Sequence, residues 1–122
     1  MNAVPVKLTT IAVIEPDGLN AALLQRWLQE AGHRVCVETP ASLRASDPVD
    51  LVVASVDSPR QAADYVRALQ AAHAAPVLLT SARFVQRPAD PDALAREMGV
   101  RAVLANPYDR GELLAAVTRA LG

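Results

Sequence analysis

A short apolar run lies in the sequence Asp50-Leu51-Val52-Val53-Ala54-Ser55-Val56-Asp57-Ser58-Pro59, with turn-forming and helix-capping residues on both sides. Such a run is typical of a strand that is buried on both faces of a parallel sheet and is followed directly by a helix. Ser55 falls at the carboxyl end of this strand, and open parallel sheets bind their ligands at that end. The residue expected in the binding crevice is therefore a neutral hydroxyl.

Strand and helix signals alternate along the rest of the chain. Apolar runs predict further strands within residues 8–14, 35–37, 76–81 and 102–105. Capping residues followed by helically spaced apolar residues predict helices that begin after Asp17, Thr39, Ser58, Asp90 and Asp109. The second of these helices is short and weak and ends at Arg44. Five strands alternating with five helices imply right-handed crossovers and one parallel sheet with helices on both faces.

Some side chains can be assigned to core or surface from the same pattern. The first helix is expected to bury an apolar stripe made of Leu19, Leu23, Leu24, Trp27, Leu28 and Ala31. The strand at 35–37 has polar flanks, which suits an edge of the sheet. Within it, Cys36 is interpreted as a small core residue rather than a reactive thiol. His33 and His73 fall at helix ends and are interpreted as surface residues, because no second His or Cys lies at metal-ligand spacing.

Length and composition indicate one domain that spans residues 1–122. The chain is 52% hydrophobic and 20% charged, with a net charge of -1, which gives enough apolar material for one core. Its near-neutral charge gives no electrostatic footprint for nucleic acid or for an anionic membrane. With one cysteine, no basic segment followed by a long apolar one at the N-terminus, and no run of about 20 apolar residues, we expect a cytoplasmic protein.

Four segments follow the predicted strands and carry a specific combination of residues. They are Glu15-Pro16-Asp17, the segment 50–59, Thr80-Ser81-Ala82, and the segment 99–109 that ends in Asn106-Pro107-Tyr108-Asp109. With these segments the chain resembles a response-regulator receiver domain over essentially its whole length. The resemblance implies an α/β, flavodoxin-like fold with five parallel strands in the order 2-1-3-4-5, and a pocket at their carboxyl ends.

The resemblance also implies a pocket chemistry that this sequence only partly retains. In receivers an acidic pair after strand one helps to bind Mg²⁺, and an Asp that ends strand three accepts a phosphoryl group from a histidine kinase. A Thr or Ser after strand four and a Lys after strand five hold the phosphate. The matching positions here are Glu15 and Pro16 for the acidic pair, Ser55 for the acceptor, Ser81 for the hydroxyl and Asn106 for the Lys.

A further departure concerns the readout of phosphorylation. Val103 stands where receivers usually have the Tyr or Phe that reports phosphorylation to the surface. Attack by an aspartyl carboxylate needs Mg²⁺ and Lys to offset the transition-state charge, and Ser55 has neither. Glu15 is the sole matched anion for a metal. The sequence therefore predicts a pseudo-receiver that binds no metal or cofactor, catalyses no reaction and is not phosphorylated at the usual position.

Two other acids lie near the same pocket. Asp17 and Asp57 are close enough in sequence to the strand ends to rebuild a metal or phosphoryl site in principle. The favoured interpretation is that Asp17 caps the first helix and that Asp57 is a solvated loop residue.

The segment 82–89 gives the candidate partner surface. It makes a long connection before the Asp90 cap and holds the chain's one Phe. Its composition is that of an exposed apolar anchor with a basic rim, made by Arg83, Phe84, Val85 and Arg87. Phe84 could equally fold back as a lid over the unused pocket. The expected partner is a signalling protein, either a histidine kinase or an output protein, or a second copy, bound through the face of helix four, strand five and helix five.

Two alternative functions stay open. The first is a small enzyme or cofactor binder on the same flavodoxin-like fold, because a fold alone does not define a function. Against it, there is no glycine-rich phosphate loop after the first strand and no nucleophile and base at recognisable spacing. The second is the receiver subunit of a transcription regulator, whose nucleic-acid-binding output would lie on another polypeptide.

Overall fold

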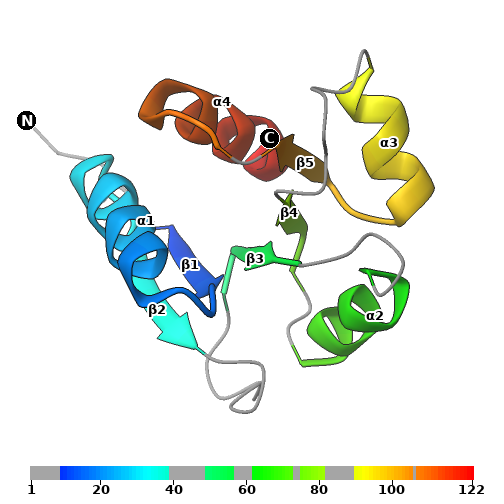
Figure 1. Ribbon diagram of the computed structural model, residues 1–122, viewed down its shortest axis with the longest axis horizontal. Helices are drawn as coiled ribbons and strands as arrows, with labels where there is room; N and C mark the ends of the chain where they lie inside the picture. The colour runs from blue at the N-terminus through cyan, green and yellow to red at the C-terminus, as the bar shows by residue number, and fades with distance from the viewer. Residues whose placement is uncertain (1–8, 39–48, 57–61, 73–74, 82–89, 106) are drawn as a thin grey trace, which may run out of the picture.

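The computed structural model describes residues 9–38, 49–56, 62–72, 75–81, 90–105 and 107–122. The chain forms the elements β1 (Thr10–Ile14), α1 (Gly18–Glu30), β2 (Arg34–Glu38), β3 (Leu51–Ser55), α2 (Ala62–Ala72), β4 (Val77–Ser81), α3 (Pro91–Met98), β5 (Ala102–Ala105) and α4 (Arg110–Leu121). All strands are parallel and lie in one sheet in the order β2-β1-β3-β4-β5 (Figure 1). The predicted fold class and strand order are confirmed.

Three aspartates begin helices where the sequence predicts them. The carboxylate of Asp17 accepts two free N–H groups in the first turn of α1, that of Asp90 accepts one in α3, and Asp109 forms a capping box with Glu112 at α4. Glycine then ends the helix at Gly99, which has the positive φ of 72° that only glycine adopts without strain. These residues fix where α1, α3 and α4 begin and where α3 ends.

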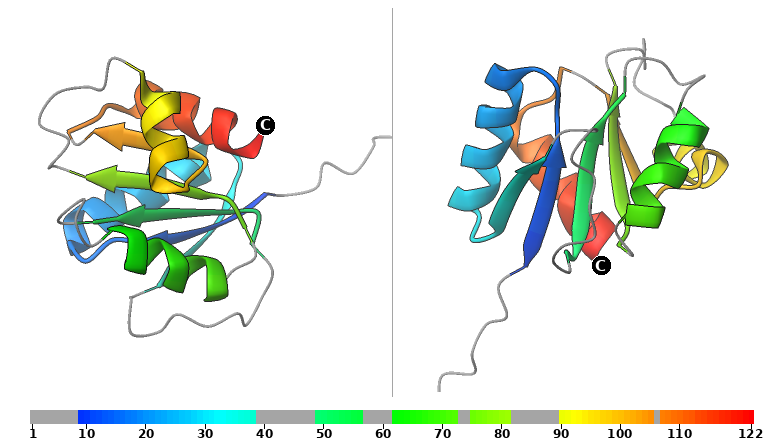
Figure 2. Two further views of the ribbon diagram at one scale, coloured as in Figure 1. Left: turned by 90° about the vertical axis from the view of Figure 1, so that its right-hand side faces the viewer. Right: turned by 90° about the horizontal axis from the view of Figure 1, so that it is seen from below.

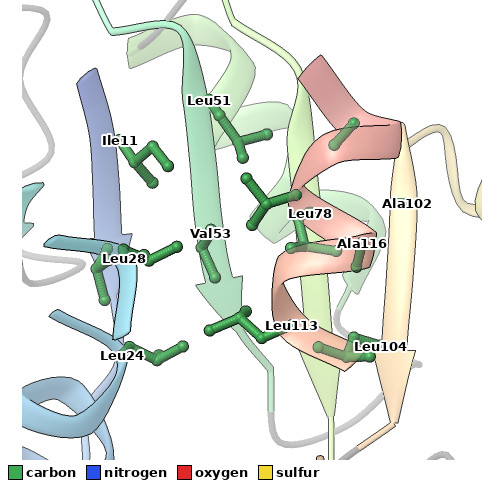
Figure 3. Packing of buried hydrophobic residues seen from close by; sticks show 13 residues of the cluster. Ile11, Leu24, Leu28, Leu51, Val53, Leu78, Ala102, Leu104, Leu113 and Ala116 are labelled. Carbon is green, nitrogen blue, oxygen red and sulfur yellow. The ribbon is translucent and has the colours of Figure 1, made fainter. Parts of the chain in front are cut away.

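Helices cover the sheet on both faces (Figure 2), so each strand alternates its side chains between two cores. On one face, α1 and α4 pack on apolar residues of the strands; this cluster includes Ile11, Leu24, Leu28, Leu51, Val53, Leu78, Leu104 and Leu113 (Figure 3). On the other face, α2 and α3 pack on a cluster that includes Ile14, Val52, Val66, Leu69, Leu79, Ala95 and Val103. The two cores hold the carboxyl ends of the strands at one edge of the sheet.

Four predicted core positions are wrong, because the structure leaves Leu19, Leu23, Ala31 and Cys36 exposed. Leu19 is 81% exposed, because it precedes the buried Leu24 by five residues and so lies roughly 140° around the helix axis. Leu23 is 41% exposed, and Ala31 at the end of the predicted stripe is exposed as well. Cys36 is exposed rather than buried, because β2 is an edge strand whose residues are mostly exposed or half-buried. The predicted helix at 39–44, the Ser58 cap and His73 lie outside the described residues.

Candidate functional site

The carboxyl ends of three neighbouring strands bring polar side chains together. Glu15 directly follows β1, Ser55 ends β3, and Thr80 lies near the end of β4. Thr80 is the register partner of Ser55 across the parallel pair. In an open parallel sheet, ligands bind at the carboxyl ends of the strands, so these residues form the candidate site.

Hydrogen bonds join these three side chains into one network. The Ser55 hydroxyl donates to Glu15 Oε1 at 3.0 Å and also lies 3.0 Å from Thr80 Oγ1. A hydroxyl has one proton to donate, and an ionised carboxylate only accepts. Because the Ser55 proton goes to Glu15, Thr80 donates to Ser55. The buried Thr80 hydroxyl, 1% exposed, is thereby linked to a carboxylate at the rim of the sheet.

The second oxygen of Glu15 is also engaged. Glu15 Oε2 accepts the backbone N–H of Asp17 at 3.1 Å. The Asp17 carboxylate is itself the N-cap of α1, since its Oδ1 accepts the N–H groups of Leu19 at 2.9 Å and Asn20 at 3.0 Å. The interpretation of Asp17 as a helix cap is confirmed. Both acids near the site therefore serve the local structure.

These residues do not fit the Mg²⁺ that a receiver fold implies. A hard dication needs several oxygen ligands in near-octahedral geometry. Glu15 is half-buried with both oxygens already accepting hydrogen bonds, and Pro16 supplies no carboxylate beside it. Among the described residues no cluster of three or more His, Cys, Asp or Glu side chains could bind a metal. Asp57 lies outside this part of the chain.

The remaining matched positions lie on the other face of the sheet or outside the described residues. Ser81 is buried and follows Leu79 by two residues, so it faces the core beneath α2 and α3. Val103, 4% exposed, belongs to that same core. The hydrogen bond of Ser55 to β4 is made by Thr80, a residue that the sequence reasoning did not single out. Asn106 lies outside the described residues.

Aromatic side chains line the neighbouring hollow. Trp27 and Tyr108 pack edge to face, with ring centroids 6.5 Å apart and an interplanar angle of 63°. Together with residues of α1 they enclose a hollow of about 170 Å³, lined by Asn20, Leu23, Leu24, Trp27, Pro107 and Tyr108. Burial of the Tyr108 ring, and second the charge of Glu15, raise the pKa of the Tyr108 phenol to about 12. Sequence reasoning placed Trp27 in the core, against which it packs, but did not predict its contact with Tyr108, which it named as part of the segment 99–109.

The predicted partner surface is only partly described. Its two helices and its strand are α3, α4 and β5, which correspond to helix four, helix five and strand five of the receiver pattern. Arg83, Phe84, Val85 and Arg87 lie outside the described residues. No described helix is long and apolar enough to cross a membrane.

No family model and no curated protein matches this chain. Solved structures do match. A response regulator from Thermotoga maritima is 16% identical with a TM-score of 0.73, covering 93% of this chain and 98% of its own. A response regulator receiver protein from Burkholderia phymatum is 23% identical with a TM-score of 0.69, over 93% and 95% of the two chains.

A third solved structure, described as a pilus assembly-related protein from Burkholderia pseudomallei, is 24% identical with a TM-score of 0.67 and covers 99% of this chain and 95% of its own. All three likenesses extend over nearly the whole of each chain. They agree with the fold that the sequence predicts. This chain has the fold of a response-regulator receiver domain.

Proposed function

We propose that residues 1–122 form one pseudo-receiver domain, a signalling module that acts by binding other proteins and is not phosphorylated at the usual position. The observation that carries this proposal is the side chain at the end of β3. Where a receiver needs a carboxylate to accept the phosphoryl group, this chain has Ser55, whose hydroxyl donates to Glu15.

The hydrogen-bond network of Thr80, Ser55 and Glu15 favours the hypothesis that the domain stays in one conformation. Thr80, Ser55 and Glu15 satisfy one another's hydrogen bonds without a ligand, so these three side chains need no metal ion to hold them in place. Val103 has no ring whose rotation could relay a change from the pocket to the surface. Both the chemical step and its relay are thus missing from the positions at which the receiver pattern has them.

The partner surface that we propose comprises α3, β5, α4 and the segment 82–89. Its occupant is a signalling protein, either a histidine kinase or an output protein. Within this surface, β5 is the strand at one edge of the sheet, and its side chains are mostly buried. The side chains that a partner would contact therefore belong to the helices and to the segment 82–89.

The proposal is tested by incubation with acetyl phosphate and Mg²⁺, followed by intact mass measurement, with a receiver that retains its acceptor Asp as positive control. We expect the mass of this chain to stay unchanged while the control gains one phosphoryl group. Amide spectra with and without beryllofluoride and Mg²⁺ should superimpose. A stoichiometric acid-labile adduct, or shifts that spread from Ser81 to Val103, would overturn the proposal.

A role in pilus assembly is a second candidate. It is supported by the likeness to the pilus assembly-related protein of Burkholderia pseudomallei, which is 24% identical and matches 99% of this chain. Deletion of the gene from its native host, followed by electron microscopy of surface pili, tests this candidate. Loss of pili that the intact gene restores would support it, and unchanged piliation would exclude it.

A further inference from the structure

The edge strand β2 differs from the other four strands of the sheet. β1, β3, β4 and β5 are almost wholly buried, whereas β2 has three exposed and two half-buried residues and none that is buried. Val37 is 47% exposed and Cys36 is exposed. Figure 1 shows β2 at one end of the row of strands, and no described strand lies beyond it. A natural edge strand with exposed apolar residues needs either protection or a partner.

The backbone of β2 offers hydrogen bonds on its outer side. Arg34 donates its N–H to Thr9 O, toward β1. In a parallel ladder the bonds to one neighbour come from alternate residues, so Arg34, Cys36 and Glu38 face β1. The N–H and C=O groups of Val35 and Val37 then point away from the sheet. Two residues with both groups directed outward are what an added strand would pair with.

The side chains of β2 make this edge complementary to itself. The strand reads Arg-Val-Cys-Val-Glu over Arg34–Glu38. In an antiparallel pair of two such strands centred on Cys36, Arg34 lies opposite Glu38 of the second copy, and Val35 lies opposite Val37. Opposite charges placed directly across two strands stabilise the pair, and like charges destabilise it. Parallel pairing in the same register would instead place arginine opposite arginine and glutamate opposite glutamate.

We propose that two copies of this chain associate through β2, antiparallel and centred on Cys36, to form one sheet that is continuous across both. The pairing is isologous and closes after two copies. The outward N–H and C=O groups of Val35 form hydrogen bonds with those of Val37 in the second copy, and the reverse. Arg34 of each copy forms an ion pair with Glu38 of the other. Because β2 and β5 are opposite edges of the sheet, this dimer leaves α3, β5 and α4 accessible.

The geometry makes Cys36 a reporter of the pairing. The backbone N–H and C=O groups of Cys36 point toward β1 and not toward the second copy. The two Cys36 residues therefore form a non-hydrogen-bonded pair, with Cα atoms about 4.5 Å apart. That separation lies within the range of about 4.4–6.8 Å that disulfides span. With copper phenanthroline as the oxidant, the two thiols lose two protons and two electrons and form one S–S bond. The cross-link would measure proximity, and the dimer itself needs no disulfide.

The experiment is a charge swap on the full chain under reducing conditions, with mass measured by sedimentation and light scattering. We expect a dimer for the wild type. Arg34→Glu or Glu38→Arg alone should raise the dimer dissociation constant by about tenfold or more, because two attractive pairs become repulsive. Arg34→Glu with Glu38→Arg should restore it. Copper phenanthroline cross-linking through Cys36 should follow the same order.

The outcomes that overturn the proposal are a monomeric wild type at concentrations of hundreds of micromolar, or single variants that dimerise as well as the wild type. Equal cross-linking in all four proteins would indicate collision of exposed thiols and would also overturn it. Circular dichroism and melting of each variant check that the monomer is folded, and Val37→Pro, which removes an outward N–H, is an independent way to abolish pairing. The inference does not rest on the proposed function. The phosphodonor test measures phosphorylation at Ser55, whereas this test measures dimerisation through β2.

Discussion

The Ser55 hydroxyl donates a 3.0 Å hydrogen bond to Glu15 across the ends of β3 and β1. The receiver resemblance implies an acid at each of these positions, which would repel each other unless a cation lay between them. Here one acid and one hydroxyl satisfy each other instead. The site is therefore stable in the absence of a ligand, and its stability depends on the neutral side chain.

Replacement of Ser55 by Asp should destabilise the domain rather than restore phosphorylation. Ser55→Asp places a second carboxylate beside Glu15 and removes the donor, and we expect a cost of about 1–3 kcal/mol in the free energy of unfolding. Ser55→Asn is the matched control, since asparagine has nearly the same size as aspartate but carries no charge. Urea unfolding at pH 7 measures both variants.

The pH dependence of the Ser55→Asp variant gives a further check. Two neighbouring carboxylates raise the pKa of the pair, so the folded state binds a proton more tightly than the unfolded state. The stability deficit against Ser55→Asn should therefore shrink as the pH falls from 7 toward 4. A deficit that is independent of pH would mean that charge is not its cause.

Asp17 should tolerate loss of its charge but not loss of its oxygen. Its Oδ1 caps α1 through two backbone N–H groups. Asp17→Asn keeps an acceptor and should leave the urea midpoint nearly unchanged, whereas Asp17→Ala should cost about 1 kcal/mol. If both variants lose the same stability, the charge rather than the cap is what matters at this position.

The sequence predicted the strands because each is an apolar run of the length and composition of a buried parallel strand, such as Leu51–Ser55. It also predicted the capping aspartates, because a cap is a local arrangement of a few residues. Both kinds of signal depend on neighbours in sequence. The placement of Ser55 at the strand end followed from the same local pattern.

The contacts of Ser55 could not be predicted in the same way. Thr80 and Ser81 both follow an apolar run, and only the register of β3 with β4 determines that Thr80 meets Ser55. The misplacement of Cys36 has a similar origin. A short run flanked by polar residues is compatible with an edge, but whether its central side chain is covered depends on which helices pack there.

The two leucines Leu19 and Leu24 test the corrected reading of α1. The sequence pattern placed both on one buried stripe, whereas Leu19 is 81% and Leu24 2% exposed. Leu24→Ala should lower the free energy of unfolding by about 2–5 kcal/mol. Leu19→Ala, the control on the same helix, should change it by less than about 0.5 kcal/mol. Comparable losses for the two variants would contradict the described orientation of α1.

The segment 82–89 remains a predicted anchor for the partner. Phe84→Ala combined with Arg87→Ala should leave the melting temperature nearly unchanged and weaken partner capture by about 2 kcal/mol or more, the scale of an interface hot spot. The partner for this measurement is the protein recovered by pull-down from the native host. A much lower melting temperature with normal capture would instead mean that Phe84 is a core residue or a lid.

Tyr108 should make the domain less stable at alkaline pH. Burial first, and Glu15 second, raise the pKa of its phenol to about 12 in the folded state, above the ordinary value of 10.0. The folded state then holds the phenolic proton more tightly than the unfolded state. The stabilisation is fully present below pH 10 and is lost as the pH rises toward 12, because the unfolded state releases its proton first.

The size of the effect and its assignment can both be measured. Because the Tyr108 side chain is only partly buried, we expect a loss on the order of 1 kcal/mol after allowance for solvent screening. Absorbance at the phenolate band, compared between the wild type and Tyr108→Phe, assigns the titration. Glu15→Gln should lower the pKa of Tyr108 only part of the way toward 10, since burial is the larger cause. A Tyr108 that titrates near 10 in the wild type would contradict its placement against Trp27 and the charge of Glu15.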